Sequence, residues 1–122
     1  MAAVAAPKLL TLVFVLKPGH VLLGMKKRGF GVGKWNGFGG KRDGSETMRE
    51  CARRELLEET SLEAPLPAFT PRGFLSFYME SDGMVDKASG AVSKVMNVFV
   101  FSVDAASCAG APRESEEMRP RW

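Results

Sequence analysis

The feature that most constrains this chain is one strongly helical segment, residues 47–59, set among short apolar runs. The segment is rich in Met, Glu, Arg, Ala and Leu and contains neither Pro nor Gly, a composition that favours an α-helix. Ser45 or Thr47 is suited to cap its first turn. Its apolar residues recur at helical spacing: Met48, Ala52, Leu56 and Leu57. We therefore predict a helix over Thr47–Glu59 that buries this stripe.

Four other apolar runs predict β-strands. Leu9–Leu16 and Val21–Met25 are separated by Pro18-Gly19-His20, so the simplest interpretation is a hairpin. Two further strands are expected at 73–79 and 95–103, joined by a long polar hairpin excursion over 80–94. The segments outside the strands and the helix are expected to be irregular: a flexible N-terminal extension at 1–8, and a loop-like tail at 105–122.

Length, cysteine content and charge limit the class of protein. The 122 residues fit a single domain, which we place at 9–122. No apolar run approaches the roughly 20 residues of a membrane helix. Cys51 and Cys108 form no disulfide or metal pattern, which favours free thiols in a reducing compartment. The net charge of +3 does not require a nucleic-acid polymer as partner. We expect a cytoplasmic monomer, with mitochondrial or nuclear pools as alternative locations.

The predicted helix carries a cluster of carboxylates. Glu55, Glu58 and Glu59 stand at positions i, i+3 and i+4, so they project from one helix face. Like charges at this spacing repel one another, and a hard cation such as Mg²⁺ removes the repulsion because it prefers carboxylate oxygens. An ordinary solvated acidic face is the alternative interpretation.

A glycine-rich segment with several basic residues precedes the helix. Residues 29–44 contain seven glycines, with Phe30, Trp35 and Phe38 among them. Backbone N–H groups in such loops bind phosphate oxygens, although neither standard phosphate-binding motif is present. Together with the carboxylates, the segment indicates a divalent cation held between an acidic helix and a phosphorylated substrate.

Residues 40–62, GKRDGSETMRECARRELLEETSL, resemble the signature of the Nudix hydrolases. Ser61 stands where the family has Gly. Residues 12–38 and the closing ESEEMRP are similar to the branch of the family that hydrolyses oxidised purine nucleoside triphosphates. The likeness covers most of residues 9–122. The matching signature positions are Gly40, Glu46, Arg54, Glu55, Leu56, Glu58, Glu59 and Leu62.

The resemblance implies an α/β fold, an α/β/α sandwich on a mixed sheet. It implies hydrolysis of a purine nucleoside triphosphate to the monophosphate and pyrophosphate, which sanitises the nucleotide pool. The cofactor would be Mg²⁺, with Mn²⁺ as an alternative. Glu55, Glu58 and Glu59 would be the catalytic residues. The implied metal ligands are the carbonyl of Gly39 and the carboxylates of Glu55, Glu58, Glu59 and Glu117.

The resemblance also assigns substrate contacts and structural residues. Asn36 would hydrogen-bond the purine base, and Arg54 would pair with Glu46 to fix the loop against the helix. Gly40 is the third structural position of the motif. The residues that would line the nucleoside pocket are Thr11, Lys26, Phe30, Phe77 and Met96.

Three departures from the family pattern modify these expectations. Ser61 replaces the glycine that ends the helix in a left-handed conformation. The 80–94 hairpin is longer than in the family. The chain also stops at Trp122, whereas the family continues with a further helix and a Trp-Pro-Asp-Asp segment. We therefore expect exposed apolar surface at Leu12, Val13 and Phe14 and weakened base recognition. Two alternatives stay open: a weakly active or inactive nucleotide-binding form, and a Nudix hydrolase of another diphosphate-linked substrate.

Overall fold

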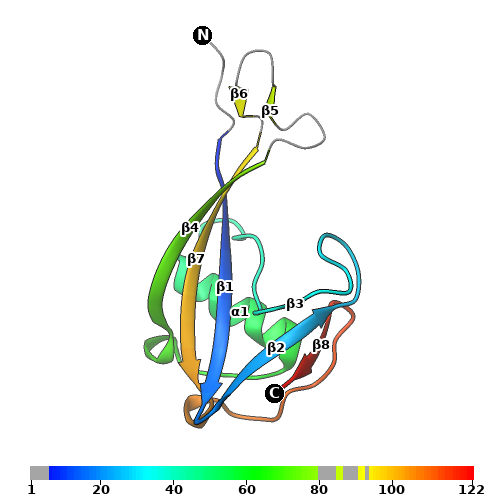
Figure 1. The fold of residues 1–122 in the computed structure, drawn as a ribbon. Coiled ribbons are helices and arrows are strands. Elements are labelled where there is room, and N and C mark those ends of the chain that lie inside the picture. Colours follow the sequence, from blue (N-terminus) through cyan, green and yellow to red (C-terminus); the bar gives the residue numbers. More distant parts are fainter. Residues whose placement is uncertain (1–5, 80–84, 87–90, 93) are drawn as a thin grey trace.

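The computed structural model describes residues 6–79, 85–86, 91–92 and 94–122. Within these residues one α-helix and a set of β-strands are arranged as Figure 1 shows. The helix is α1 (Met48–Thr60), and two 3₁₀ turns lie at Leu66–Ala68 and Ala105–Ser107. The strands are β1 (Lys8–Lys17), β2 (His20–Lys26), β3 (Trp35–Asn36), β4 (Thr70–Met79), β5 (Val85–Asp86), β6 (Ala91–Val92), β7 (Lys94–Asp104) and β8 (Met118–Arg121).

The main sheet is mixed, as the sequence predicted, with the strand order β3-β2-β1-β7-β4. β1 lies at its centre, antiparallel to β2 and parallel to β7. β4 pairs antiparallel with β7, with an irregularity between Pro71 and Gly73. β8 pairs with the edge of β2 opposite β3, and the short β5 and β6 pair with each other. Of the excursion expected over 80–94, the structure describes β5, β6 and the first residue of β7, and the remainder lies outside the described residues.

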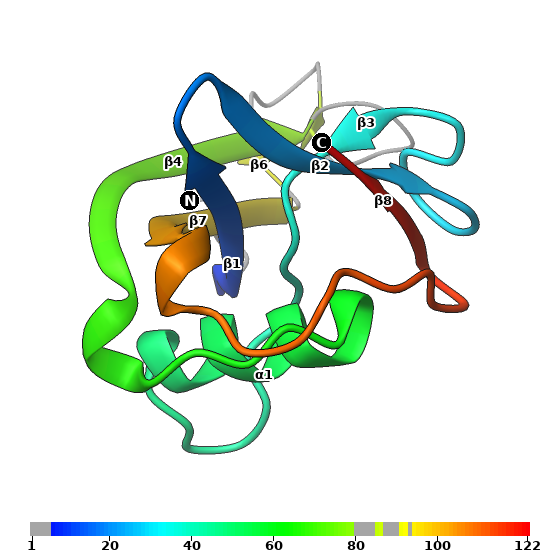
Figure 2. The same ribbon diagram turned by 90° about the horizontal axis from the view of Figure 1, so that it is seen from below.

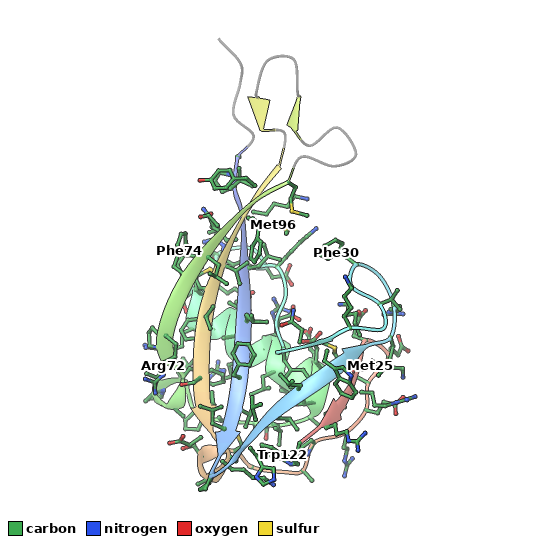
Figure 3. The ribbon with its side chains drawn as sticks, viewed as in Figure 1. Met25, Phe30, Arg72, Phe74, Met96 and Trp122 are labelled. Carbon is green, nitrogen blue, oxygen red and sulfur yellow. The ribbon has the colours of Figure 1, made fainter. Side chains whose placement is uncertain are left out.

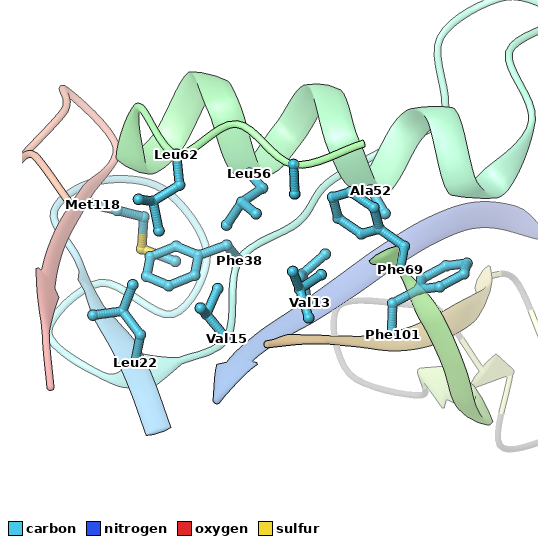
Figure 4. Packing of buried hydrophobic residues seen from close by; sticks show 12 residues of the cluster. Val13, Val15, Leu22, Phe38, Ala52, Leu56, Leu62, Phe69, Phe101 and Met118 are labelled. Carbon is cyan, nitrogen blue, oxygen red and sulfur yellow. The ribbon is translucent and has the colours of Figure 1, made fainter. Parts of the chain in front are cut away.

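Helix α1 covers one face of this sheet (Figure 2). Side chains alternate between the two faces of a strand, so Val13 and Val15 of β1 point toward the helix, and both are fully buried. Figure 4 shows them packed with Phe38 and with Leu56 of α1. Burying large apolar side chains contributes roughly 1.5–3 kcal/mol each, so this layer supplies much of the stability of the fold.

The opposite face of the sheet is covered by no helix within the described residues. On this face Leu75 and Phe77 of β4 are 46% and 44% exposed, whereas Phe74 and Tyr78 lie on the helix side of the same strand and are exposed there. The expectation of exposure at Val13 was wrong, because Val13 lies on the helix side of β1. Its neighbours Leu12 and Phe14 lie on the other face and are partly exposed.

The structure corrects the sequence analysis in three further places. Leu57 is 40% exposed, and Cys51 takes its place in the buried stripe, because the interior face of the helix is centred on Ala52 and Leu56. Lys8 already belongs to β1, whereas residues 1–5 of the expected extension lie outside the described residues. The tail is not wholly loop-like, since it contains β8. Among the described helices none is long and apolar enough to cross a membrane.

Candidate active site

The position of helix α1 is fixed at its first residue by a capping box. Thr47, the N-cap, accepts a hydrogen bond on Oγ1 from the backbone N–H of Glu50 at 3.1 Å. The Glu50 carboxylate in turn accepts one from the N–H of Thr47 at 2.8 Å. This reciprocal pair satisfies two otherwise unpaired donors. The helical register that follows determines where the three candidate carboxylates project.

The glycine-rich segment reaches the helix through a close backbone approach. Phe38 and Gly40 are hydrogen-bonded to β1, the latter through its carbonyl, which accepts from Thr11 N–H at 2.9 Å. A Cβ on Gly39 would collide with the Thr11 carbonyl, and one on Gly40 would lie 2.8 Å from the Glu55 carboxylate. The clash at Gly39 is with backbone, so only glycine permits this approach there, and it brings the loop backbone against the acidic face of α1.

One carboxylate of the cluster is buried beneath this loop, and a second is partly buried there. Glu59 is 4% exposed and accepts a hydrogen bond on Oε1 from the Gly39 N–H at 2.8 Å. Burial raises the pKa of Glu59 to about 7, and the charges of Glu55 and Glu117 act in the same direction. Burial likewise raises the pKa of Glu55. Desolvation penalises the charged form of a carboxyl, and for both groups this penalty outweighs the favourable contacts that the structure gives them.

The third carboxylate, Glu58, is exposed and belongs to an ion-pair network around Arg54. The Arg54 guanidinium lies 2.7 Å from Glu46, 2.8 Å from Glu55 and 3.3 Å from Glu58. It also donates to the Lys41 carbonyl at 3.0 Å. The pairing of Arg54 with Glu46 that the resemblance implied is thus present, and Arg54 connects the loop, the approach to the helix and the acidic face.

The facing wall of the site comes from the end of β2 and the residues before β8. Glu117 lies 3.4 Å from Lys26 Nζ and 2.7 Å from Arg28 Nη2. The hydrogen bond from Arg28, helped by Lys26, holds the pKa of Glu117 below its usual range. Helix, loop and wall enclose an open cleft of about 600 Å³. Its lining residues are Lys26, Arg28, Gly39, Gly40, Glu55, Glu58, Glu59, Ser115, Glu116 and Glu117.

All five expected metal ligands therefore line one cleft, although Glu117 is far from the helix in sequence. Of the residues expected to contact the nucleoside, Lys26 lines this cleft and the others do not. Phe77 and Met96 are neighbours, as register partners on β4 and β7. Phe30 is 83% exposed on the glycine-rich loop, away from Met96 (Figure 3). The Thr11 side chain is buried against Cys51, with its hydroxyl 3.4 Å from Sγ.

Asn36, the remaining expected base contact, is exposed in β3. Its side-chain oxygen accepts a hydrogen bond from the Gly37 N–H at 2.8 Å. Sequence reasoning missed Arg28, Ser115 and Glu116 as cleft residues. The signal was available, because a basic run at 26–28 and an acidic run at 114–117 are complementary in charge. What the sequence could not show was that β2 and β8 pair and bring the two runs together.

The chemistry of the cleft suits a divalent cation. Within the described residues, no three His, Cys, Asp or Glu side chains already converge on one metal position. In this structure the carboxylates are instead held by Arg54, the Gly39 N–H and Arg28. Yet Glu59, which is buried, and Glu55, which is partly buried, have raised pKa values and line the same open cleft as Glu117. Carboxylate oxygens are the donors that a hard cation prefers, so the residues present fit such an ion.

The fold is that of an α/β protein: a mixed sheet is covered on one face by a helix. The acidic face of this helix opens on a cleft that Lys26 and Arg28 also line. The comparison with known families makes the class specific: the NUDIX domain profile matches residues 7–122. The chain belongs to the Nudix family.

Individual relatives agree with that assignment. The chain is 48% identical over 115 residues to the oxidized purine nucleoside triphosphate hydrolase of Danio rerio, and 47% identical over 115 residues to that of Mus musculus. In both cases the match covers 94% of this chain and 65% of the relative, so the chain spans just under two thirds of their length.

Solved structures show the same fold. A mutator MutT protein from Bacillus halodurans superposes with a TM-score of 0.75 at 25% identity, covering 94% of this chain and 67% of that one. A MutT NUDIX hydrolase from Burkholderia pseudomallei gives a TM-score of 0.74 at 22% identity, covering 96% and 82%. The α/β Nudix fold predicted from the sequence is therefore confirmed.

Proposed function

We propose that this chain hydrolyses purine nucleoside triphosphates, oxidised ones in particular, to the monophosphate and pyrophosphate. The observation that carries the proposal is the shared cleft, in which Glu55, Glu58 and Glu59 of α1 face Glu117, Lys26 and Arg28. The similarity to hydrolases of oxidised purine triphosphates supports the choice of substrate. The domain responsible would be a single one over residues 9–122.

The four glutamates would hold Mg²⁺, or alternatively Mn²⁺, together with the Gly39 carbonyl. Such a cation would neutralise triphosphate charge and lower the pKa of the attacking water. Lys26 and Arg28 are paired with Glu117 in this structure and stand where phosphate oxygens would enter. With Glu117 as a ligand of the cation, Lys26 and Arg28 would be free to bind the phosphates and to stabilise the departing pyrophosphate.

The nucleoside would lie beyond the cleft. Phe77 and Met96 offer an aromatic ring and a polarisable thioether to a planar base. Asn36 would hydrogen-bond the base, with Thr11, Lys26 and Phe30 completing the pocket. These contacts stay predictions, as do the cytoplasmic location and the monomeric state.

The test is pyrophosphate release by the purified 122-residue protein with Mg²⁺. An 8-oxo-purine deoxynucleoside triphosphate is compared with the unmodified nucleotide, and wild type with Glu59→Gln. We expect a preference for the oxidised base and a loss of about 100-fold or more in the variant, because the amide keeps the volume but removes the charge.

Circular dichroism and a thermal melt show whether each protein is folded. Full activity in folded Glu59→Gln would refute the assignment of the site. Nucleotide binding by folded wild type without turnover would favour the binding-protein alternative. A better rate with a dinucleotide or another diphosphate-linked compound would change the substrate but keep the cleft.

A further inference from the structure

The residues before β8 form a short turn, Glu114–Glu117, whose last side chain faces the helix carboxylates across the cleft. We propose that Lys27 is the positioning residue of this turn and so of the Glu117 carboxylate. The inference rests on the proposed function in one respect, which is that Glu117 is a ligand of the divalent cation.

Lys27 follows directly after β2 and contacts three of the four residues of the turn. Its ammonium donates to Glu114 Oε2 at 2.6 Å and to the Ser115 carbonyl at 2.8 Å. Its backbone N–H donates to the Glu117 carbonyl at 2.8 Å. One residue therefore holds both the start and the end of the turn, through its side chain and its backbone respectively.

The far end of the turn is anchored independently. Met118 is 4% exposed in the core and pairs with Lys26 across the β2–β8 ladder. Ser115 closes the turn, since its N–H donates to the Met118 carbonyl at 2.9 Å and its Oγ accepts from the Met118 N–H at 3.1 Å. The start of the turn has less support, because among the described residues the Glu114 side chain pairs, besides Lys27, only with Arg119, at 3.4 Å.

The consequence concerns the direction in which Glu117 points. Arg28 also contacts the turn, at 3.4 Å from Glu116 and 2.7 Å from Glu117. Without the Lys27 ammonium, these contacts can draw the turn outward with the Arg28 side chain, which is 59% exposed. Because partly exposed ion pairs contribute little to stability, losing Lys27 should affect cation binding far more than folding.

The experiment measures Mn²⁺ binding to the 122-residue protein by electron paramagnetic resonance, so it needs no turnover. Lys27→Met is compared with Lys34→Met, a matched loss of one lysine from the glycine-rich loop, where the described residues give its ammonium no ion pair. Groups that orient metal ligands typically matter by 10-fold or more, so we expect Kd to rise by about tenfold in Lys27→Met. Lys34→Met should stay near wild type, and Lys27→Arg should restore most of the affinity.

A second pair of variants separates positioning from general damage. Glu117→Gln should itself weaken Mn²⁺ binding, and adding Lys27→Met to it should cause no further loss if Lys27 acts through Glu117. Equal additional losses in both backgrounds would refute the proposal. Should Lys27→Met fail to fold, Glu114→Gln removes the same ion pair and must weaken binding in the same direction.

The outcomes distinguish this inference from the proposed function. Wild type that binds Mn²⁺ while Lys27→Met binds equally well refutes only the role of Lys27. Folded wild type that binds no Mn²⁺ refutes the cation site, and the positioning role with it. Kd raised in Lys27→Met alone, with kcat at saturating Mg²⁺ unchanged, supports positioning rather than a part in the chemistry.

Discussion

The two ends of helix α1 differ in how their polar groups are satisfied. At the N-terminal end a capping box closes on Thr47, and Arg54 pairs with Glu46, which lowers the pKa of Glu46 to about 2. At the C-terminal end Glu59 is buried with a pKa raised to about 7. There the last turn carries no basic residue, and Ser61 caps it in a left-handed conformation with φ of 67°.

The difference shows where this helix serves stability and where it serves the site. Paired and capped groups stabilise the N-terminal end. The C-terminal end retains a buried carboxyl that costs stability unless something positive joins it. Strongly perturbed carboxyls in a cleft are typical of functional sites, and this contrast leads to four predictions.

The largest expected effect is at Glu59 in metal-free protein. Its pKa is raised from 4.5 to about 7, so the folded state holds a proton that the unfolded state releases, and stability falls as pH rises through this interval. Glu59→Gln removes the titration and keeps an acceptor for the Gly39 N–H. We expect the free energy of unfolding of this variant to exceed that of wild type by about 2 kcal/mol at pH 8 and to equal it at pH 4.

Urea unfolding in EDTA measures this difference, and Glu63→Gln, an exposed carboxyl on the loop after the helix, is the control. Adding Mg²⁺ should stabilise wild type and leave the variant unchanged. A variant less stable than wild type at pH 8 would mean that the Glu59 charge is already balanced, which would remove the contrast between the two ends.

The next effect has the opposite sign and lies at Glu46. Its hydrogen bond from Arg54 lowers the pKa to about 2, so its stabilising contribution is complete above pH 4.5 and is lost as pH falls toward 2. Glu46→Gln should cost about 1–2 kcal/mol at pH 7, less than the shift alone would give because solvent screens the pair. The urea midpoints of wild type and Glu46→Gln, measured as a function of pH, test this prediction. A difference between the two midpoints that stays unchanged down to pH 2 would contradict it.

A smaller loss is expected at the helix cap. Thr47→Ala removes the acceptor for the Glu50 N–H and should destabilise the protein by about 1 kcal/mol at any pH between 5 and 8. Thermal melts of Thr47→Ala and Thr47→Ser separate the hydroxyl from the methyl group, since Ser keeps the cap. If both variants melt alike, the capping box is not what secures this end.

The sequence predicted most of the fold because its patterns were local. The helix was predicted within one residue at each end, and capping by Thr47 was one of two options considered. The strands at 9–16 and 95–103 were also predicted, because β-branched and apolar runs are recognisable without their partners. The tail strand β8 was missed, since MRPR has neither apolar alternation nor high strand propensity. Only its pairing with β2 makes it a strand.

In the candidate site, too, the residues given by local patterns were predicted, and those that depend on long-range contacts were not. Glu55, Glu58 and Glu59 follow from helical spacing alone, and Glu117 was assigned through the resemblance. Arg28 and Lys27 could not be placed because their roles depend on the β2–β8 ladder, a contact between the two ends of the chain. The burial of Glu59 likewise depends on the approach of Gly39, which spacing within the helix does not reveal.

The smallest expected effect concerns Ser61, where the sequence departs from the family signature. The sequence analysis placed a left-handed residue here, and Ser61 is the only non-glycine residue with positive φ among those described. Its N–H still donates to the Leu57 carbonyl at 2.9 Å. Because a Cβ is disfavoured in this conformation, Ser61→Gly should stabilise the protein by roughly 0.5–1 kcal/mol, with the greater flexibility of unfolded glycine offsetting part of the gain.

The matched control is Ser45→Gly, the same change at an exposed position without positive φ, which should be neutral or destabilising. Urea midpoints of the two variants at pH 7 decide the matter. A gain at Ser61 alone would show that the C-terminal end of α1 carries two separate costs, one in its backbone and one in the Glu59 carboxyl. Combining Ser61→Gly with Glu59→Gln should then give additive stabilisation, because a backbone dihedral and a desolvated charge are independent terms.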